Sequence, residues 1–232
     1  MRFPVARSRE RFGDRSAAGR QLAARLEDYR GTDTVVAGLP RGGVPVAFEI
    51  AVALDLELDV IVVRKLGAPW QPELALGAVG ENGVRVLNAA VAATTGIGDD
   101  ELAAIERRET AEVARRAALF RAGREGAPLV GRGVIVVDDG VATGATTRAA
   151  CEVARATGAR KVVLAVPVAP AESLAELAAS ADELVCLLAP TGFSSVGEWY
   201  DNFTQTSDAE VIALLEAAAT RRAPPDESAT DP

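Results

Sequence analysis

Short apolar runs alternate with longer amphipathic segments along most of the chain. The apolar runs are rich in valine and isoleucine, which is typical of strands covered on both faces. They predict strands at residues 34–37, 59–63, 84–87, 134–137, 161–166 and 183–188. The segments between them repeat apolar residues every three or four positions, as helices do. They predict helices at residues 16–29, 44–54, 99–122, 145–157, 171–180 and 207–218.

This alternation predicts an α/β fold with a mostly parallel, twisted sheet and helices on both of its faces. One domain is expected over residues 1–220, followed by a polar tail at 221–232 whose composition favours disorder. Residues 67–83 are rich in glycine and proline and predict a long loop or a loose hairpin. Ligands of parallel sheets bind beyond the carboxyl ends of the strands, so the loops there should carry the function.

The composition argues against several classes of function. The chain has 232 residues, of which 49% are hydrophobic, so one domain with a full core can form. Its net charge of −8 argues against a nucleic-acid partner, and no apolar run approaches the roughly 20 residues that span a bilayer. The charged N-terminus lacks the apolar core of a secretory signal, and Cys151 and Cys186 are expected to be buried and unpaired. These features predict a cytoplasmic enzyme.

The chain contains no histidine. Catalysis by Ser-His-Asp or Cys-His groups and most zinc sites need an imidazole, so these are excluded. Two distant cysteines also exclude a zinc site of four thiolates. The chemistry must therefore use carboxylates, arginine, lysine, hydroxyls, backbone amides or a hard cation.

The segment after the valine-rich run at 134–137 carries the strongest functional signal. Asp138 and Asp139 end the predicted strand, and a loop of small and hydroxyl residues leads into the next helix. Amides at a helix N-terminus attract anions, so this loop predicts a site for a phosphate monoester. The two acids could accept hydrogen bonds from sugar hydroxyls or hold water around a divalent cation. An ordinary capped helix is the alternative.

The two acids followed by Thr-Gly-x-Thr resemble the diphosphoribose-binding loop of type I phosphoribosyltransferases. The resemblance implies that Asp138 and Asp139 hold the ribose hydroxyls of phosphoribosyl pyrophosphate (PRPP). It implies that the 5′-phosphate is cradled by Ala142, Thr143, Gly144, Ala145 and Thr146. It also implies Mg²⁺ as cofactor, held mainly through PRPP, with Asp138 and Asp139 as contacts through water.

Two further loops are predicted at the same edge of the sheet. Arg41 and Gly42 follow the first strand, and the resemblance implies that they contact pyrophosphate in a loop that often contains a non-proline cis peptide bond. Arg64 and Lys65 close the second strand and would bind pyrophosphate as cations. The alternatives are an ordinary turn with a surface arginine and a solvated pair. The implied catalytic set is Asp138, Asp139, Arg41, Arg64 and Lys65.

The segment at 67–83 corresponds to the flexible loop with which this family covers its substrate. Its acids, Glu73 and Glu81, could be functional, but solvated loop carboxylates are the favoured interpretation. Residues 190–206 correspond to the hood of the family, where Phe193, Trp199 and Tyr200 could stack on an acceptor base. An aromatic cluster packed on the core is the alternative. Ala142 stands where purine-using members often carry an acid.

The resemblance extends over about residues 11–215. The chain is similar to a bacterial branch of the family in the order of four motifs: Arg-Phe-x-Asp-Arg, Leu-Pro-Arg-Gly-Gly-Val-Pro, Val-Val-Arg-Lys-Leu-Gly and Val-Gly-Glu-Trp-Tyr. It predicts a Mg²⁺-dependent phosphoribosyltransferase that uses PRPP and an unidentified nitrogen acceptor. Its partners would be small molecules, not nucleic acid or a membrane, and a homodimer is expected from the fold. The alternatives are a sensor that binds PRPP or nucleotide without transfer, and a phosphatase or hydrolase of phosphorylated sugars.

Overall fold

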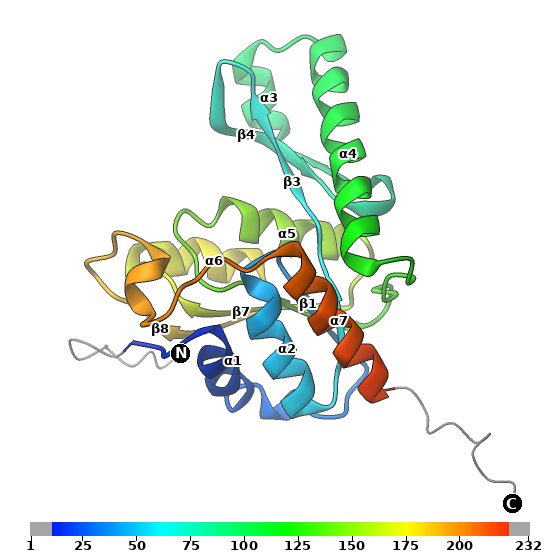
Figure 1. Cartoon of the computed structure of the whole chain (residues 1–232). Helices are drawn as coiled ribbons and strands as arrows, with labels where there is room; N and C mark the ends of the chain where they lie inside the picture. Colours follow the sequence, from blue (N-terminus) through cyan, green and yellow to red (C-terminus); the bar gives the residue numbers. More distant parts are fainter. Residues whose placement is uncertain (1–10, 223–232) are drawn as a thin grey trace, which may run out of the picture.

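The computed structural model describes residues 11–222, and its centre is a five-stranded parallel sheet in the order β2-β1-β6-β7-β8 (Figure 1). Each neighbouring pair of these strands is parallel. The strands are β1 (Thr34–Gly38), β2 (Glu57–Val60), β6 (Gly133–Val137), β7 (Lys161–Val168) and β8 (Glu183–Leu188). The predicted α/β fold is therefore confirmed.

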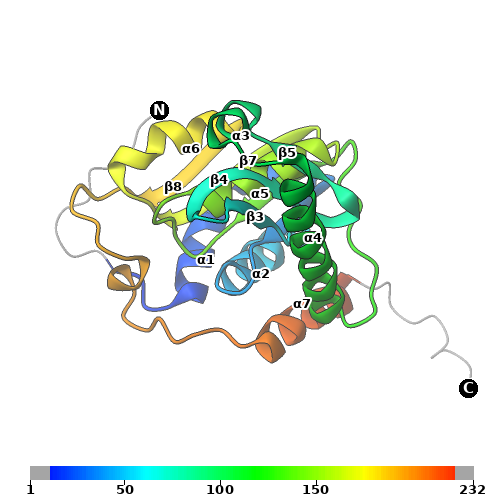
Figure 2. The same cartoon turned by 90° about the horizontal axis from the view of Figure 1, so that it is seen from above.

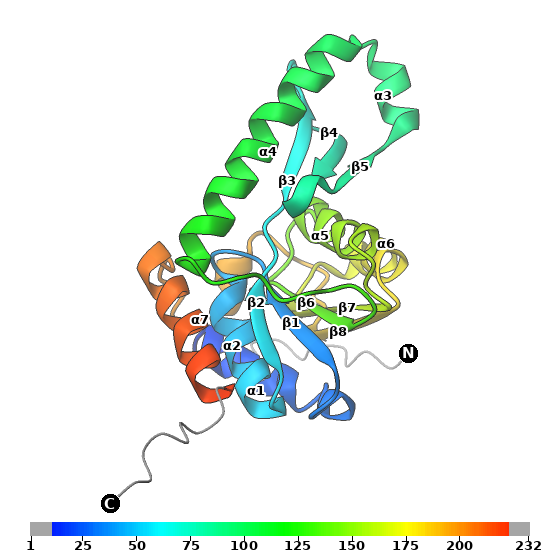
Figure 3. The same ribbon diagram turned by 90° about the vertical axis from the view of Figure 1, so that its right-hand side faces the viewer.

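Helices cover both faces of this sheet (Figure 3). One face carries α1 (Arg15–Ala23), α2 (Gly43–Leu54) and α7 (Asp208–Arg222), and the other carries α5 (Ala145–Ala156) and α6 (Leu174–Ser180). Alternate residues of β6 divide between these layers, because successive side chains of a strand point to opposite faces. Ile135 and Val137 pack with the first group, whereas Val134 and Val136 pack with the second.

A second unit, which we call the arm, rises from the core between β2 and β6 (Figures 1 and 3). It contains an antiparallel sheet of three strands in the order β3-β4-β5, with two helices beside it. Seen from above, the arm lies over α5 (Figure 2). Its elements are β3 (Arg64–Ala68), β4 (Gln71–Val79), β5 (Arg85–Leu87), α3 (Ala89–Thr95) and α4 (Asp99–Arg121).

The arm corrects one prediction and confirms another. The strand predicted at 59–63 ends at Val60, so Arg64 and Lys65 begin β3 of the arm instead of closing a core strand. The segment predicted as a long loop or a loose hairpin takes part in the antiparallel hairpin β3–β4, whose register shifts at Gly67. Helix α3 was not predicted, because its run of alanine, valine and threonine has no amphipathic repeat.

The helix ends show smaller differences. The helix predicted at 16–29 stops at Ala23 and is followed by a separate 3₁₀ turn, Glu27–Tyr29, and the helix predicted at 171–180 likewise begins with a 3₁₀ turn, Ala171–Ser173. Ser207 caps α7 as predicted, since its Oγ accepts from the amide of Glu210 at 3.1 Å. Helix α7 runs to Arg222 and so includes the first two residues of the predicted tail, and residues 223–232 lie outside the described part.

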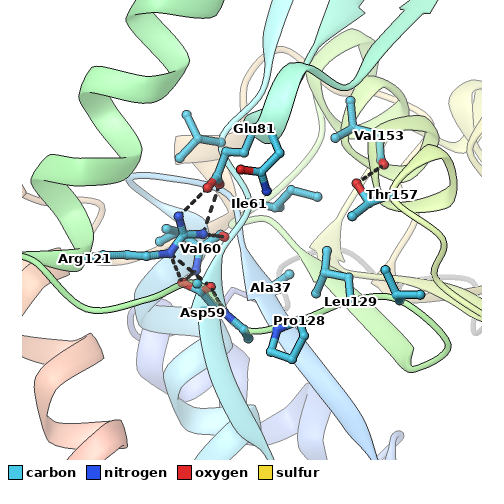
Figure 4. A pocket seen from close by; sticks show the side chains of 15 residues that line it. Ala37, Asp59, Val60, Ile61, Glu81, Arg121, Pro128, Leu129, Val153 and Thr157 are labelled. Carbon is cyan, nitrogen blue, oxygen red and sulfur yellow. Dashed lines mark hydrogen bonds and ion pairs between the residues drawn. The ribbon is translucent and has the colours of Figure 1, made fainter.

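A cluster of buried charge joins the arm to the core (Figure 4). Arg121, at the end of α4, donates from Nε to Asp59 Oδ1 at 2.9 Å and from Nη2 to Glu81 Oε1 at 3.0 Å. Burial disfavours the charged guanidinium, but the hydrogen bonds that Arg121 donates to Glu81 and Asp59 outweigh it and raise the pKa of Arg121. Glu81 is therefore part of an ion cluster, and its interpretation as a solvated loop carboxylate is wrong. The Glu73 side chain lies outside the described part.

Both cysteines are free, as predicted. Cys151 is buried as predicted, whereas Cys186 is only half-buried, and burial raises the pKa of each thiol to about 12. Within residues 11–222, no helix combines the length and the apolar character that a membrane crossing requires.

Candidate active site

The loops that follow β1 and β6 lie side by side, because their strands are neighbours in the sheet. We call residues 39–42 the β1 loop and residues 138–144 the β6 loop. Gly38 is in register with Val137, and the amide of Leu39 donates to the carbonyl oxygen of Val137 at 2.8 Å. Two of the three predicted functional loops therefore meet at the carboxyl edge of the sheet.

Glycines allow these loops to touch. A Cβ atom added at Gly42 would lie 1.9 Å from Asp139 Oδ2, and one added at Gly43 would lie 2.5 Å from the carbonyl oxygen of Val137. Both distances are far below van der Waals contact, so a larger residue would push the β1 loop away from the β6 loop. The absence of side chains at these two positions therefore sets the distance between the β1 loop and the β6 loop.

The β6 loop leads into α5 through Gly144, whose φ of 75° lies in the left-handed region that favours glycine. Among the described residues, no side chain caps this helix, so the alternative of an ordinary capped helix is wrong. Ala142, Thr143 and Thr146 are exposed around the helix start. Uncapped amides and the positive end of a helix dipole make this an environment for an anion.

Asp138 and Asp139 are largely enclosed at the end of β6. The amide of Asp139 donates to Asp138 Oδ1 at 2.9 Å, and Thr147 Oγ1 lies 3.4 Å from Asp138 Oδ2. Burial, together with the charge of Asp139, raises the pKa of Asp138 well above its usual value. Burial also raises the pKa of Asp139, although the Arg15 guanidinium opposes that shift. Sugar hydroxyls or a hydrated cation could supply the stabilising contacts that these carboxylates lose on burial.

Arg15, the first residue of α1, reaches Asp139 from the beginning of the described chain. Its Nε and Nη2 lie 2.8 and 2.7 Å from Asp139 Oδ2. The sequence does not predict this pairing, because the two residues are 124 positions apart and Arg15 is only one residue of the branch motif. No local pattern could have revealed it.

Arg41 projects from the β1 loop, which contains a cis peptide bond between Pro40 and Arg41, as the resemblance implied. Its Nη1 lies 3.7 Å from Asp208 Oδ1 at the start of α7, and both side chains are partly exposed. Partly exposed ion pairs at this distance contribute little stability. The guanidinium can therefore exchange Asp208 for a phosphate group at little cost.

The arm forms one wall of a cleft of about 670 Å³, which Pro40 and Thr146 border from the core. Cations from two elements of the arm line this cleft: Arg64, Lys65, Arg108 and Arg116. The first two were predicted here, although from a core strand. The other two come from α4, whose charged residues carried no functional prediction because spacing alone did not show that the helix faces the site.

A buried carboxylate of α4 orients two of these cations. Glu109 is 7% exposed and accepts from Arg64 Nε and Arg108 Nε, each at 2.9 Å. Burial favours the neutral acid, but the two arginines outweigh it and hold the pKa of Glu109 below its usual value. The alternative interpretation of Arg64 and Lys65 as a solvated pair is therefore wrong for Arg64.

The family described as phosphoribosyl transferase domain matches residues 11–198, most of the chain. The chain belongs to this family. The expected family is therefore confirmed. The match includes the β1 loop, the arm, the β6 loop and the start of the hood.

Two proteins of Mycobacterium tuberculosis, each named "Putative phosphoribosyl transferase" (MT0597 and Rv0571c), are 58% identical over 207 residues. The alignment covers 89% of this chain but 47% of theirs, so the chain spans about half the length of these relatives. The crystal structure of TT1426 from Thermus thermophilus is 45% identical, covers 88% of this chain and 97% of that one, and superposes with a TM-score of 0.81.

The hood of this phosphoribosyl transferase domain is only partly as predicted. Tyr200 is 4% exposed, with its ring 5.4 Å from Phe12 and 5.0 Å from Phe203, so its expected role in stacking on an acceptor is wrong. Its hydroxyl instead donates to the carbonyl oxygen of Asp139 at 2.5 Å. Phe193 and Trp199 are half-buried against the same cluster, and their acceptor role stays a prediction.

The side chains of this domain that could bind a metal ion limit how such an ion could be held. Within residues 11–222, no group of three or more Asp, Glu, His or Cys residues is placed to bind a metal ion by itself. Asp138 and Asp139 are two adjacent oxygen donors, which suit Mg²⁺ when a phosphate ligand and water supply the other contacts.

Proposed function

We propose that the chain is a Mg²⁺-dependent phosphoribosyltransferase that moves the 5-phosphoribosyl group of PRPP to a nitrogen acceptor and releases pyrophosphate. One observation carries the proposal: the β1 and β6 loops touch through Gly42 and Asp139, beside a cleft lined by cations. An uncapped helix start after the acid pair, together with a group of cations in the neighbouring cleft, matches a sugar that is phosphorylated at two positions.

Each part of PRPP would meet a different part of the site. Residues 142–146 would bind the 5′-phosphate at the uncapped start of α5. Asp138 and Asp139 would accept hydrogen bonds from the ribose hydroxyls. Arg41 and Gly42 would hold the pyrophosphate from the β1 loop, and Arg64 and Lys65 from the arm.

Electrostatic stabilisation of the leaving group would supply much of the catalysis. Negative charge builds up on the pyrophosphate as its bond to C1 of the ribose breaks, and fixed cations are effective where charge develops. Arg41, Arg64 and Lys65 would supply that charge, while Asp138 and Asp139 would stabilise the positive charge that develops on the ribose. Bound Mg²⁺ would add to the neutralisation of the leaving group.

The arm and the hood would control access to the reacting carbon. The arm would exclude water, which otherwise competes with the acceptor for the ribose cation. A nitrogen nucleophile would approach from the hood side, where Phe193 and Trp199 are the proposed contacts. Ala142 supplies no carboxylate to meet a purine. We further propose that the protein acts on small molecules in the cytoplasm, without nucleic acid or a membrane, and as a homodimer.

The test combines binding with turnover. Calorimetry with PRPP and Mg²⁺ should give saturable binding in the wild type, which Asp139→Asn should weaken, whereas Asp28→Asn on the exposed surface should not. A panel of bases and amines is then screened for acceptor-dependent release of pyrophosphate. Absence of PRPP binding would overturn the proposal. Binding without any turnover would favour a sensor, and release without an acceptor would favour a hydrolase.

A further inference from the structure

Arg15 is the only residue in the described part whose side chain forms an ion pair with Asp139. Two of its nitrogens contact the same carboxylate oxygen, Oδ2. The side chain is 11% exposed, so the pair is shielded from solvent and is screened less than a surface pair. Nothing in the proposed mechanism yet uses this contact.

The guanidinium is itself held from a second side. Its Nη1 donates to the carbonyl oxygen of Thr204 at 2.7 Å, and its Cζ lies 3.9 Å from the centre of the Phe203 ring. The helix from which it extends is fixed by Asp14, whose Oδ1 accepts from the amide of Ala17 at 2.7 Å. Arg15 therefore connects α1 and the end of the hood with the β6 loop.

We propose that Arg15 is a positioning residue, which fixes the Asp139 carboxylate in the orientation that receives the ribose hydroxyls. The inference rests on the proposed function, because it assigns the sugar to Asp139. An ionised carboxylate offers about four acceptor sites, so two bonds from Arg15 leave capacity for a sugar. A carboxylate that is held in place before binding loses less freedom when the sugar arrives.

Among the described residues, the other groups that face Asp139 bring no positive charge to it. The Asp138 carboxylate accepts from the Asp139 amide, and the Tyr200 hydroxyl contacts only the Asp139 carbonyl oxygen. Gly42 lies directly against Oδ2 and leaves no room for the carboxylate to shift toward the β1 loop. Without Arg15, no other ion pair in the described part would hold the Asp139 carboxylate in this orientation.

Three ligands separate this role from general attraction of anions. PRPP, ribose 5-phosphate and inorganic pyrophosphate, each with Mg²⁺, are titrated calorimetrically into the wild type, Arg15→Gln, Arg15→Lys and Arg20→Gln. Arg20 lies on the same helix, is exposed and pairs with Glu49, so its variant is the matched control. Pyrophosphate has no ribose, so its affinity reports only on the anion-binding part of the site.

Arg15→Gln is expected to weaken PRPP and ribose 5-phosphate by on the order of 10- to 100-fold, the range seen when an outer partner that orients a metal ligand is removed. Pyrophosphate affinity should stay within about twofold, because its proposed contacts lie on other elements. Arg15→Lys keeps the charge but loses the planar fork, so it should recover part of the loss. Arg20→Gln should bind all three ligands as the wild type does.

Several outcomes would overturn the inference. Unchanged affinities in a folded Arg15→Gln variant would show that Arg15 does not position Asp139. An equal loss of affinity for pyrophosphate would show that Arg15 attracts anions in general. Tighter binding of PRPP and ribose 5-phosphate would show that Arg15 hinders sugar binding. If Arg15→Gln does not fold, Phe203→Leu keeps the charge, removes the stacking and should give a smaller loss that is again confined to the sugars. A wild type that binds none of the ligands would refute the proposed function itself.

Discussion

The core wall of the cleft and its arm wall are held by different physical means. The β1 and β6 loops lie on adjacent strands and touch through glycine, so close packing sets their distance. The arm packs on α5 but also depends on buried charge, through the cluster of Asp59, Glu81 and Arg121 and through Glu109. Packing tolerates almost no displacement, whereas ion pairs respond to neighbouring charge. The core wall therefore has a fixed geometry, whereas the arm wall carries charge that can adjust.

Arg121→Met tests the arm wall and should have the largest effect. It leaves Asp59 and Glu81 without their cation, and removing one partner of a buried ion pair destabilises by about 3–5 kcal/mol. Urea denaturation should show this loss in the free energy of unfolding. Arg115→Met on the same helix removes an exposed pair with Glu112 and should change stability little. A stable Arg121→Met protein would mean that packing alone holds the arm.

Gly42→Ala tests the core wall. The added methyl would overlap Asp139 Oδ2, so the two loops must separate. A misplacement of about 1 Å can reduce activity by roughly 100-fold, and a loss of that order is expected in PRPP binding by calorimetry. Gly13→Ala is the control, because an added Cβ there has no neighbour within 4 Å. Equal binding by the two variants would show that the core wall is not rigid.

Asp138→Asn should have the smallest effect on stability, and the effect should be a gain. The pKa of Asp138 lies well above its usual 3.8 in the folded protein, so its stabilising contribution is present below pH 3.8 and is lost as the pH rises. Asparagine removes that penalty, and the free energy of unfolding at pH 7 should rise by about 0.5–2 kcal/mol while PRPP binding falls.

Thermal melting at several pH values checks this prediction. The gain should disappear near and below pH 3.8, the usual pKa of the carboxyl. Asp182→Asn is the opposite control, since the pKa of Asp182 is lowered by a hydrogen bond from the Val162 amide and by Arg155. That variant should lose stability at pH 7. A loss of stability at pH 7 in both variants would show that the buried Asp138 carboxyl does not destabilise the folded protein.

The parts of the molecule that the sequence predicted depend on local pattern. Valine-rich runs identify the core strands, and the acids, glycines and threonines of the β6 loop identify the predicted phosphate site, because each of these depends on neighbours in the chain. The arm was harder to predict. Periodicity shows that a segment is extended but not to which sheet it belongs, so the strand predicted at 59–63 and the start of β3 were merged.

The contacts that complete the site could not be predicted, because they join residues that are far apart in sequence. Arg15 reaches Asp139 across 124 positions, and Arg64 reaches Glu109 across 45. A high density of aromatic residues marks the hood in the sequence, but density does not distinguish a stacking surface from a small core. Tyr200 belongs to that core, packed between the start of the chain and the end of the hood.

The link between Arg15 and the hood has a consequence for biosynthesis. Arg15 donates to Thr204, which follows it by 189 residues, and Phe12 bridges to Tyr200. A ribosome therefore has to make the chain as far as Thr204 before the guanidinium can take its final place. A growing polypeptide that already contains the β6 loop would still lack the hood contacts that hold Arg15 beside Asp139.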